Sequence, residues 1–340
     1  MALQSSSDQL HDAWRALAGG EGAGSTGWRT IPVSAGARPV RAGRRFPEDT
    51  EALLVGFRGV THAPVSALPK GRGFSVAFTQ LSAPNLETTW LALSREAGAS
   101  LELFSAMADD LLVALSRVDT AEDRLALRLF LERIAAWQAF MRQDTSMALS
   151  AEAELGLFGE LTFLAMLLDK GVAPRIGIFA WRGPLGSPQD FVFAKGSVEV
   201  KSTHRVGAFP AFISSLEQLD ESLAPPLFLA ALRFTTGAAG RTLDELIKAL
   251  RRALTPEVEA AAEFDSRLLH AGVAPAVGCV GDRRLSLSES RLLVVHPGFP
   301  RLTRASVPSS LTRASYELDL DRISSLTASL DEIATSVGVL

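Results

Sequence analysis

Residues 189–203 read QDFVFAKGSVEVKST, and this stretch of sequence decides the fold that we expect. Apolar and charged residues alternate from residue 197 to residue 202, so Val198 and Val200 face one side of a strand while Glu199 and Lys201 face the other. Residues 190–193 form a second short strand that opens with Asp190. If the two strands pair as a hairpin through residues 195 and 196, Asp190 and Glu199 come within reach of one ion.

Two carboxylates on adjacent strands suit a hard divalent cation such as Mg²⁺, which binds a few carboxylate oxygens and keeps several waters. Lys201 would then orient or deprotonate the attacking water, or neutralise the charge that builds on a phosphate. The chain contains five Lys against 29 Arg. A position that needed only positive charge would usually carry Arg, so lysine at 201 favours a compact or titratable ammonium group.

A third acid, Glu160, lies on the helix that we expect over residues 151–169. The apolar stripe of this helix passes through Leu157, Leu161 and Leu164, and Glu160 stands at its edge. An unpaired carboxylate that points toward a sheet is costly. A metal site or Lys201 would provide its partner.

The elements around this stretch follow the order αβββαβ, which is an α/β fold. They are a helix over 151–169, strands over 175–181, 190–193 and 197–202, a helix over 214–221 and a strand over 227–234. Beyond them we expect two helices over 243–254 and 256–271, a hairpin-like stretch over 284–296 and a final helix over 321–337.

The N-terminal part has a different pattern. A short helix over 10–17 is followed, from residue 28 to about residue 96, by β-favouring runs broken by Pro and Gly. Apolar residues at helical spacing predict two helices between residues 101 and 142. We therefore expect a β-rich domain (1–98), a helical spacer (99–149), an α/β core (150–300) and a C-terminal strand and helix extension (301–340).

Composition and charge exclude some classes of protein. With 47% hydrophobic and 21% charged residues in a chain of 340, a disordered protein is excluded. The formal net charge of −4 does not indicate a nucleic-acid partner. Residues 283–313, however, carry six Arg against one acid, Glu289, and we expect this local basic patch to hold a nucleic-acid backbone.

The single cysteine, Cys279, excludes intramolecular disulfides and CxxC-type zinc sites and indicates a reducing compartment. Its apolar neighbours favour a buried, small hydrophobic side chain. The first residues lack the basic start and apolar run of a signal peptide, and no apolar stretch approaches the roughly 18 residues of a membrane span. We therefore expect a cytoplasmic protein without a membrane segment.

A helix glutamate, then QD before a strand, then EVK on the next strand resemble the PD-(D/E)XK nuclease superfamily, whose core has the order αβββαβ. The segments LGLFGELTFL (155–164), QDF and VEVKST resemble, more narrowly, a family of PD-(D/E)XK motif proteins. These proteins occur in bacterial restriction and phage-defence gene clusters beside methyltransferase and ATPase components. The resemblance covers most of the chain and is weakest in the first hundred residues.

The resemblance implies a role for each residue of the site. Asp190 and Glu199 would bind Mg²⁺, or Mn²⁺ in its place. Lys201 would assist the nucleophilic water, and Glu160 would be the acid borne on the helix. The superfamily motif has Pro directly before Asp. This chain departs from it, because residue 189 separates Pro188 from Asp190.

Other candidates for substrate contacts are weaker. Gln218 lies where related nucleases often place a polar residue near the substrate. Ser202, Thr203 and His204 follow the EVK strand, where they are able to contact a phosphate. Trp137 and Trp181 are expected in the core, with a nucleic-acid contact as the less favoured role of Trp181.

The expected activity is metal-dependent hydrolysis of DNA phosphodiesters by in-line attack of water. The resemblance implies defence against foreign DNA, methyltransferase and ATPase partners, and a homodimer. Two alternatives stay open. One is a non-catalytic DNA-binding or assembly subunit of a restriction or phage-defence complex. The other is a small-molecule enzyme, which would need a deep apolar pocket in place of an open basic groove.

Overall fold

The computed structural model describes residues 5–18, 27–33, 38–60, 68–71, 73–81, 88–142, 149–275 and 281–340. The chain divides into two compact units, residues 1–146 with 274–278 and residues 147–273 with 279–340. Eight α-helices and three sheets lie in the described residues, so the mixed α/β class expected from the sequence is confirmed. None of these helices has the length and apolar character needed to cross a membrane.

The N-terminal unit is built on a five-stranded antiparallel sheet in the order β1-β2-β3-β5-β4. Its elements are α1 (Ser6–Leu17), β1 (Gly27–Val33), β2 (Val40–Phe46), β3 (Thr50–Arg58), β4 (Phe74–Thr79), β5 (Thr88–Arg95), α2 (Leu101–Ser116) and α3 (Asp123–Arg142). Strand β2 was not predicted, because its three arginines hide the alternation that marks the other strands.

A buried polar group joins α2 to α3. Asp110 accepts hydrogen bonds from Arg133 Nε at 2.6 Å and from Trp137 Nε1 at 2.7 Å. All three side chains are almost fully buried. The pairing satisfies charges that would otherwise be costly in the interior, and the expected core position of Trp137 is confirmed.

The second unit holds a four-stranded mixed sheet in the order β10-β9-β7-β6 and a separate β8-β11 pair. Strands β7 and β9 are parallel, and the other pairs are antiparallel. The elements are α4 (Ala151–Asp169), α5 (Pro174–Ala180), β6 (Phe191–Phe193), β7 (Gly196–Thr203), β8 (Pro210–Ile213), β9 (Leu227–Arg241), α6 (Leu243–Leu254), α7 (Val258–His270), β10 (Leu285–Val295), β11 (Tyr316–Asp319) and α8 (Leu330–Ser336).

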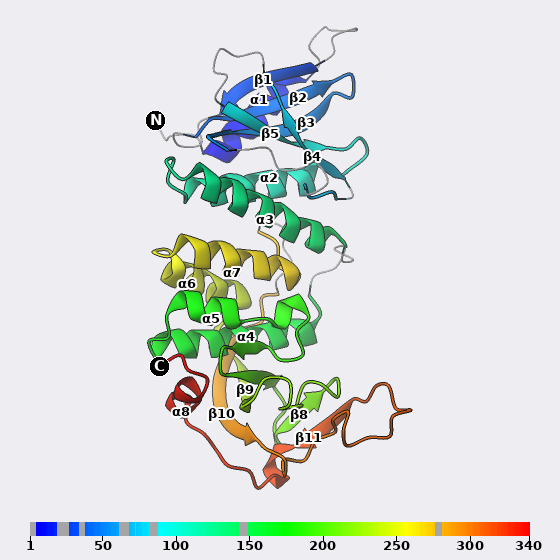
Figure 1. Cartoon of the computed structure of the whole chain (residues 1–340), viewed down its shortest axis with the longest axis vertical. Coiled ribbons are helices and arrows are strands. Elements are labelled where there is room, and N and C mark those ends of the chain that lie inside the picture. The colour runs from blue at the N-terminus through cyan, green and yellow to red at the C-terminus, as the bar shows by residue number, and fades with distance from the viewer. Residues whose placement is uncertain are drawn as a thin grey trace. The chain divides into compact units, whose positions relative to one another are not determined.

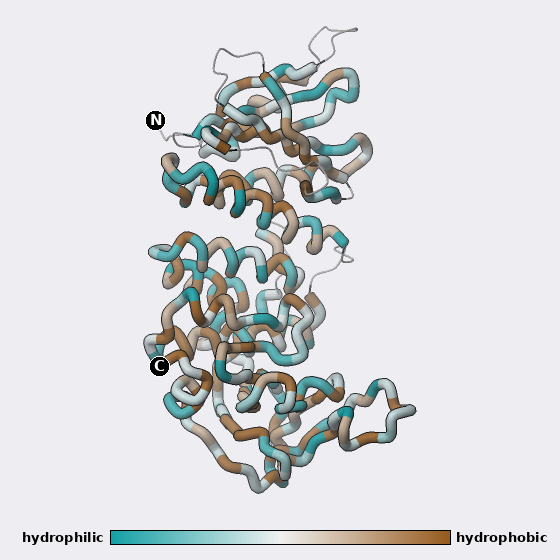
Figure 2. The backbone as a smooth tube through the Cα atoms, viewed as in Figure 1, coloured by the Kyte–Doolittle hydropathy of each residue, from teal (hydrophilic) through white to brown (hydrophobic). Residues whose placement is uncertain are grey.

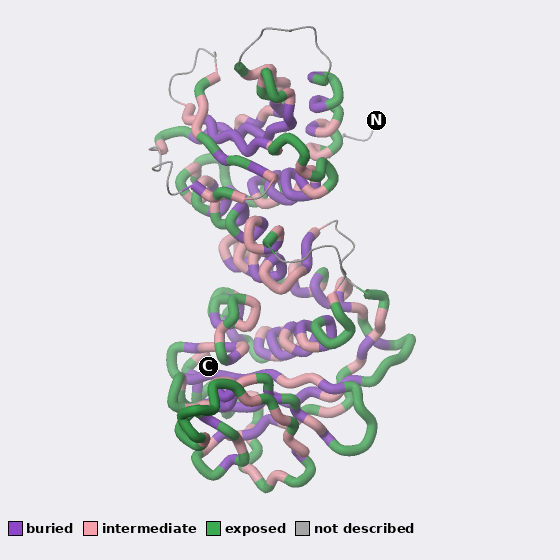
Figure 3. Tube along the Cα trace, turned by 90° about the vertical axis from the view of Figure 1, so that its right-hand side faces the viewer, coloured by how far each residue is buried: buried purple, intermediate pink, exposed green. Residues whose placement is uncertain are grey.

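Alternation along β9 produces the layers of this unit. Phe228 and Ala230 join the core formed with helices α4 to α7, while Leu229 and Ala231 join a second core with residues of β8. Figure 1 shows the helices on one side of the sheet and β8 and β11 on the other. Hydrophobic residues gather where the helices meet the sheet (Figure 2). Strand β7 and the first half of β9 are mostly buried, while the connecting loops are largely exposed (Figure 3).

The strand predicted over residues 175–181 is wrong, because these residues form α5. Pro174 stands in its first turn, where a missing N–H costs nothing. Gly177 allows a close approach to α4, since a Cβ atom there would lie 3.2 Å from Leu164 Cδ1. The apolar run was interpreted as a strand because periodicity cannot distinguish a short buried helix from a strand.

The helix predicted over residues 214–221 is also wrong, since these residues form turns between β8 and β9. Side chains satisfy the local backbone there. Gln218 Oε1 accepts a hydrogen bond from Ser214 N at 2.8 Å, and Asp220 Oδ1 accepts one from Ser222 N at 3.1 Å. Bonds of this kind compete with helical bonds. The crossover between the parallel strands β7 and β9 thus lacks the expected helix.

Two predictions near the C-terminus need correction. The hairpin-like stretch over 284–296 is the single strand β10, which pairs with β9 along its length. The final helix predicted over 321–337 is limited to α8, with a short 3₁₀ turn at Leu320–Arg322 before it. Cys279, expected to be buried, lies outside the described residues.

Candidate active site

The β6–β7 hairpin brings the two halves of the decisive stretch together. Phe191 pairs with Val198 and Phe193 with Gly196, so the predicted pairing is confirmed. Gly196 makes the turn at φ +149°, and a Cβ atom there would lie 2.7 Å from Pro226 O. The hairpin places Asp190 beside β7, where Asp190 Oδ2 accepts a hydrogen bond from Val200 N at 2.8 Å.

Glu199 and Lys201 face the same side of β7, as their alternation predicts. Lys201 Nζ lies 2.7 Å from Glu199 Oε1. The side chain of Glu199 has no exposed surface, and its Oε2 atom has no hydrogen-bond partner in the described residues. A fully buried carboxylate with a spare oxygen is costly unless a cation or a proton meets it.

Glu160 reaches the same cluster from α4. Its Oε2 atom accepts a hydrogen bond from Trp181 Nε1 at 2.6 Å. A Cβ atom added to Gly183 would lie 2.8 Å from both Glu160 Oε2 and Asp190 Oδ1, so the two carboxylates converge on this glycine. Asp190 is held there by its own backbone, because its carbonyl oxygen accepts a hydrogen bond from Gly183 N at 3.0 Å.

The sequence analysis missed two residues of this arrangement. Trp181 is fully buried, as predicted for a core residue, but it also orients Glu160. Gly183 provides the space into which both carboxylates point. The only feature of the sequence that could have indicated Trp181 and Gly183 was their position shortly before Asp190. That feature could not be interpreted while residues 175–181 were assigned to a strand.

Burial and mutual repulsion shift the pKa values of the cluster. Burial first, and then the charge of Asp190, raises the pKa of Glu160 well above its usual range and that of Glu199 to about 8. Burial also raises the pKa of Asp190. Burial alone would lower the pKa of Lys201, but the charges of Glu199 and Asp190 outweigh it and hold this pKa above its ordinary value. Three carboxylates thus share one ammonium group and demand further positive charge.

The donor set suits a hard divalent cation. In the part of the chain that the structure describes, no group of three Asp, Glu, His or Cys side chains is already arranged to hold a metal ion. The available donors are nevertheless all carboxylate oxygens, which Mg²⁺ and Mn²⁺ prefer. The unpartnered Oε2 atom of Glu199 is one such donor, and Asp190 lies beside it in the hairpin. The residues therefore fit the expected metal.

The weaker candidates divide between two places. Gln218 belongs to the cluster, since its Oε1 atom accepts a hydrogen bond from Lys201 Nζ at 3.1 Å. Ser202, Thr203 and His204 instead line a separate pocket at the end of β7. Gln218 therefore reaches the site from a turn, although the helix expected to carry it is absent.

The basic stretch over residues 283–313 does not form an uncompensated positive patch. Five of its six arginines make ion pairs with acids. Arg301 pairs with Glu221, and Arg304 Nε lies 2.8 Å from Glu217 Oε1. These partners come from a distant part of the sequence, so counting charges within the stretch overestimated its potential.

A protein-family model matches most of the chain. The family described as "Putative PD-(D/E)XK family member" (DUF4420) matches residues 10–321. No curated protein and no solved structure matches the chain. The matched range covers most of both units and includes Glu160, Asp190, Glu199 and Lys201. The resemblance to PD-(D/E)XK proteins is thus confirmed, and the chain belongs to this family.

Proposed function

We propose that this protein is a metal-dependent nuclease that hydrolyses phosphodiester bonds of DNA. One observation carries the proposal: Glu160, Asp190, Glu199 and Lys201 meet in one buried, acid-rich cluster. Membership of the PD-(D/E)XK superfamily, whose members are usually nucleases, supports the same activity.

Asp190 and Glu199 would hold the divalent cation, with Glu160 at the edge of the same site. A bound Mg²⁺ would supply Lewis acidity toward a phosphoryl oxygen and a lowered pKa for a coordinated water. Residues of this chain hold the acids of the site in position. Trp181 holds Glu160 in place through its indole N–H, and the backbone N–H of Val200 holds Asp190.

In this proposal Lys201 acts on the scissile phosphate. Its ammonium group is held between Glu199 Oε1 at 2.7 Å and Gln218 Oε1 at 3.1 Å, so it has a third proton free. A raised pKa keeps this group charged at neutral pH. Lys201 would orient the attacking water and stabilise negative charge on the phosphate as the bond breaks.

Cleavage of supercoiled plasmid and single-stranded DNA with Mg²⁺ or Mn²⁺ tests the proposal. Asp190→Asn and Lys201→Ala should each lower the rate by at least about a hundredfold, as expected for groups that stabilise the transition state. Asp169→Asn and Lys195→Ala are matched controls, because both side chains are exposed. The proposal fails if the wild-type protein leaves DNA intact, and binding without cleavage would favour the non-catalytic alternative.

Defence against foreign DNA is the biological role in this proposal, with methyltransferase and ATPase components as partners and a homodimer as the active form. The support for it is the resemblance of segments 155–164, QDF and VEVKST to proteins of defence clusters. A homodimer would allow the two strands of a duplex to be cut by two copies of the same cluster.

A further inference from the structure

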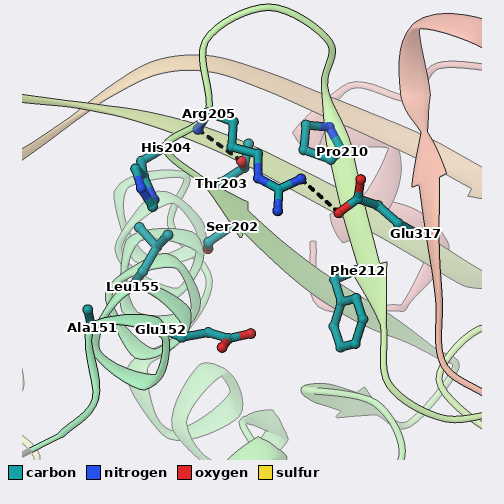
Figure 4. A pocket seen from close by; sticks show the side chains of 10 residues that line it. All are labelled: Ala151, Glu152, Leu155, Ser202, Thr203, His204, Arg205, Pro210, Phe212 and Glu317. Atoms are coloured by element: carbon teal, nitrogen blue, oxygen red, sulfur yellow. Dashed lines mark hydrogen bonds and ion pairs between the residues drawn. The ribbon is translucent and has the colours of Figure 1, made fainter.

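A pocket of about 350 Å³ lies next to the acidic cluster, at the end of β7. Its walls come from the first turns of α4, from the end of β7 and from the β8-β11 pair. Figure 4 shows Phe212 and Glu317 along one side and Leu155, Ser202 and His204 along the other. None of these lining residues carries a role in the mechanism described above.

The walls of the pocket include an apolar slot between Phe212 and Leu155. Strand β8 alternates, so Ala211 and Ile213 enter the core while Phe212 points outward with 49% of its surface exposed. Leu155 on α4 supplies apolar surface across the pocket. An exposed aromatic ring opposite an aliphatic wall is the surface on which a planar ring stacks.

The polar part of the pocket includes two carboxylates that can accept hydrogen bonds. Glu152 and Glu317 both line it, and the register of the β8-β11 pair places Glu317 directly across from Phe212. Arg205 Nη1 lies 2.9 Å from Glu317 Oε2, so these two charges offset each other, and Glu152 and His204 are the other titratable side chains of the lining. A neutral planar group with amino donors would find a stacking face in Phe212 and a carboxylate acceptor in Glu152.

The pocket lies close to the reacting phosphate of the proposed function. Ser202 is the next residue after Lys201 on β7, and Thr203 follows it about 7 Å from Lys201 along the strand. A group bound there belongs to a nucleotide beside the bond being cut. A base inside a duplex is stacked and paired, and it reaches such a slot only when it is unpaired or flipped.

We propose that this pocket binds one unstacked base beside the scissile phosphate, so that single-stranded DNA, or duplex DNA with an unpaired base, is the preferred substrate. This inference rests on the proposed nuclease function and names its substrate. Phe212 stacks on the base, and Glu152 accepts hydrogen bonds from its amino group. Thymine lacks an exocyclic amino group and is bound less well than cytosine or adenine.

Binding of labelled oligonucleotides tests the proposal without depending on cleavage. The full chain carrying Asp190→Asn is titrated with a single strand and with the matching blunt duplex, with and without Phe212→Ala. Loss of one stacking partner should weaken binding of the single strand about tenfold and leave the duplex unchanged. Phe212→Leu should restore only part of the affinity. Phe179→Ala removes another exposed phenylalanine, 40% exposed on α5, and should have no effect.

The outcomes separate this proposal from the nuclease function. If the wild-type protein cuts DNA but Phe212→Ala binds the single strand as well as its parent does, the pocket proposal is wrong and the nuclease stands. Equal losses on the single strand and the duplex also overturn it, since stacking on a paired base was excluded. A selective loss on the single strand in a protein that never cuts DNA would support the pocket and refute the nuclease.

Discussion

Glu199 is completely buried, and its Oε2 atom has no hydrogen-bond partner among the residues that the structure describes. Its pKa is about 8 in the folded protein, against 4.5 as the ordinary value. Between these two pH values the folded state binds more protons at this site than the unfolded state does. The free energy of unfolding therefore falls as pH rises through this window.

We expect the melting temperature of the metal-free protein to fall as pH rises from 4.5 to 8, and the fall to be smaller in Glu199→Gln, which cannot ionise. Thermal unfolding followed by circular dichroism measures this. Glu122→Gln is the control, because the exposed Glu122 should leave the pH profile unchanged. Identical profiles for the wild type and Glu199→Gln would contradict the assignment of the shift to Glu199.

Gly183 has no side chain, and this leaves room for the carboxylates of Glu160 and Asp190. In Gly183→Ala the added methyl group would lie 2.8 Å from an oxygen of Glu160 and an oxygen of Asp190. Both carboxylates end flexible side chains, so they move aside while the fold is kept. We expect the melting temperature to change little and the cleavage rate to fall by about a hundredfold, the typical effect of a small misplacement in an active site.

Gly237→Ala is the matched control for Gly183→Ala, since no atom lies within 4 Å of a Cβ atom built there. Rates on plasmid DNA and melting temperatures of both variants give the comparison. A Gly183→Ala protein as active as the control would show that the carboxylates do not need to converge on this position.

At the scale of elements, α4 and β7 carry the cluster together. A Cβ atom at Gly159 would collide with Ser202 Oγ and lie 3.1 Å from Ser202 Cβ, so the helix lies very close to the strand at this level. Glu160 follows directly in the sequence. The close contact therefore sets how far Glu160 reaches toward Asp190.

Two glycines of α4 allow a matched test of this contact. Gly156 faces open space, so Gly156→Ala should stabilise the protein by about 0.5–1 kcal/mol through helix propensity. Gly159→Ala should destabilise it, because the collision with Ser202 outweighs the same gain. Urea unfolding measures both, and Ser202→Gly should restore stability to Gly159→Ala. Equal effects at the two positions would show that α4 can move away from β7 at no cost.

At the scale of the whole molecule, each unit has its own core and its own buried ionic groups. Asp110, Arg133 and Trp137 belong to the N-terminal unit, and the acidic cluster belongs to the other. Units with separate cores commonly unfold as separate cooperative transitions. A substitution in one unit should then shift the unfolding transition of that unit and leave the other transition unchanged.

We expect calorimetry to show two transitions. Mg²⁺ at a hundredfold excess over its dissociation constant should stabilise the cluster-bearing unit by about 2.7 kcal/mol, and Asp190→Asn should abolish the shift. Asp110→Ala leaves Arg133 buried without its partner and should destabilise the other unit by about 3 kcal/mol or more. One transition that responds to both changes would show that the units unfold together.

Local patterns in the sequence were sufficient for part of this structure. Alternation over residues 197–202 and the short link at Lys195 and Gly196 determined the hairpin, because a strand pair closed by a tight turn depends on neighbouring residues alone. The pairing of Asp190, Glu199 and Lys201 follows from that register, and the bounds of the long, mostly apolar helix α4 were predicted to the residue.

Only the tertiary structure decided the rest, since the contacts that matter join residues far apart in the chain. Trp181 meets Glu160 because a predicted strand is the helix α5, whose ends depend on packing against α4. Arg301 and Arg304 of the basic stretch pair with Glu221 and Glu217, which lie about eighty residues earlier in the chain, so charge counting within the stretch could not show this compensation. The slot lined by Phe212 exists because β8 pairs with β11, a hundred residues later, and no local pattern encodes such a pairing.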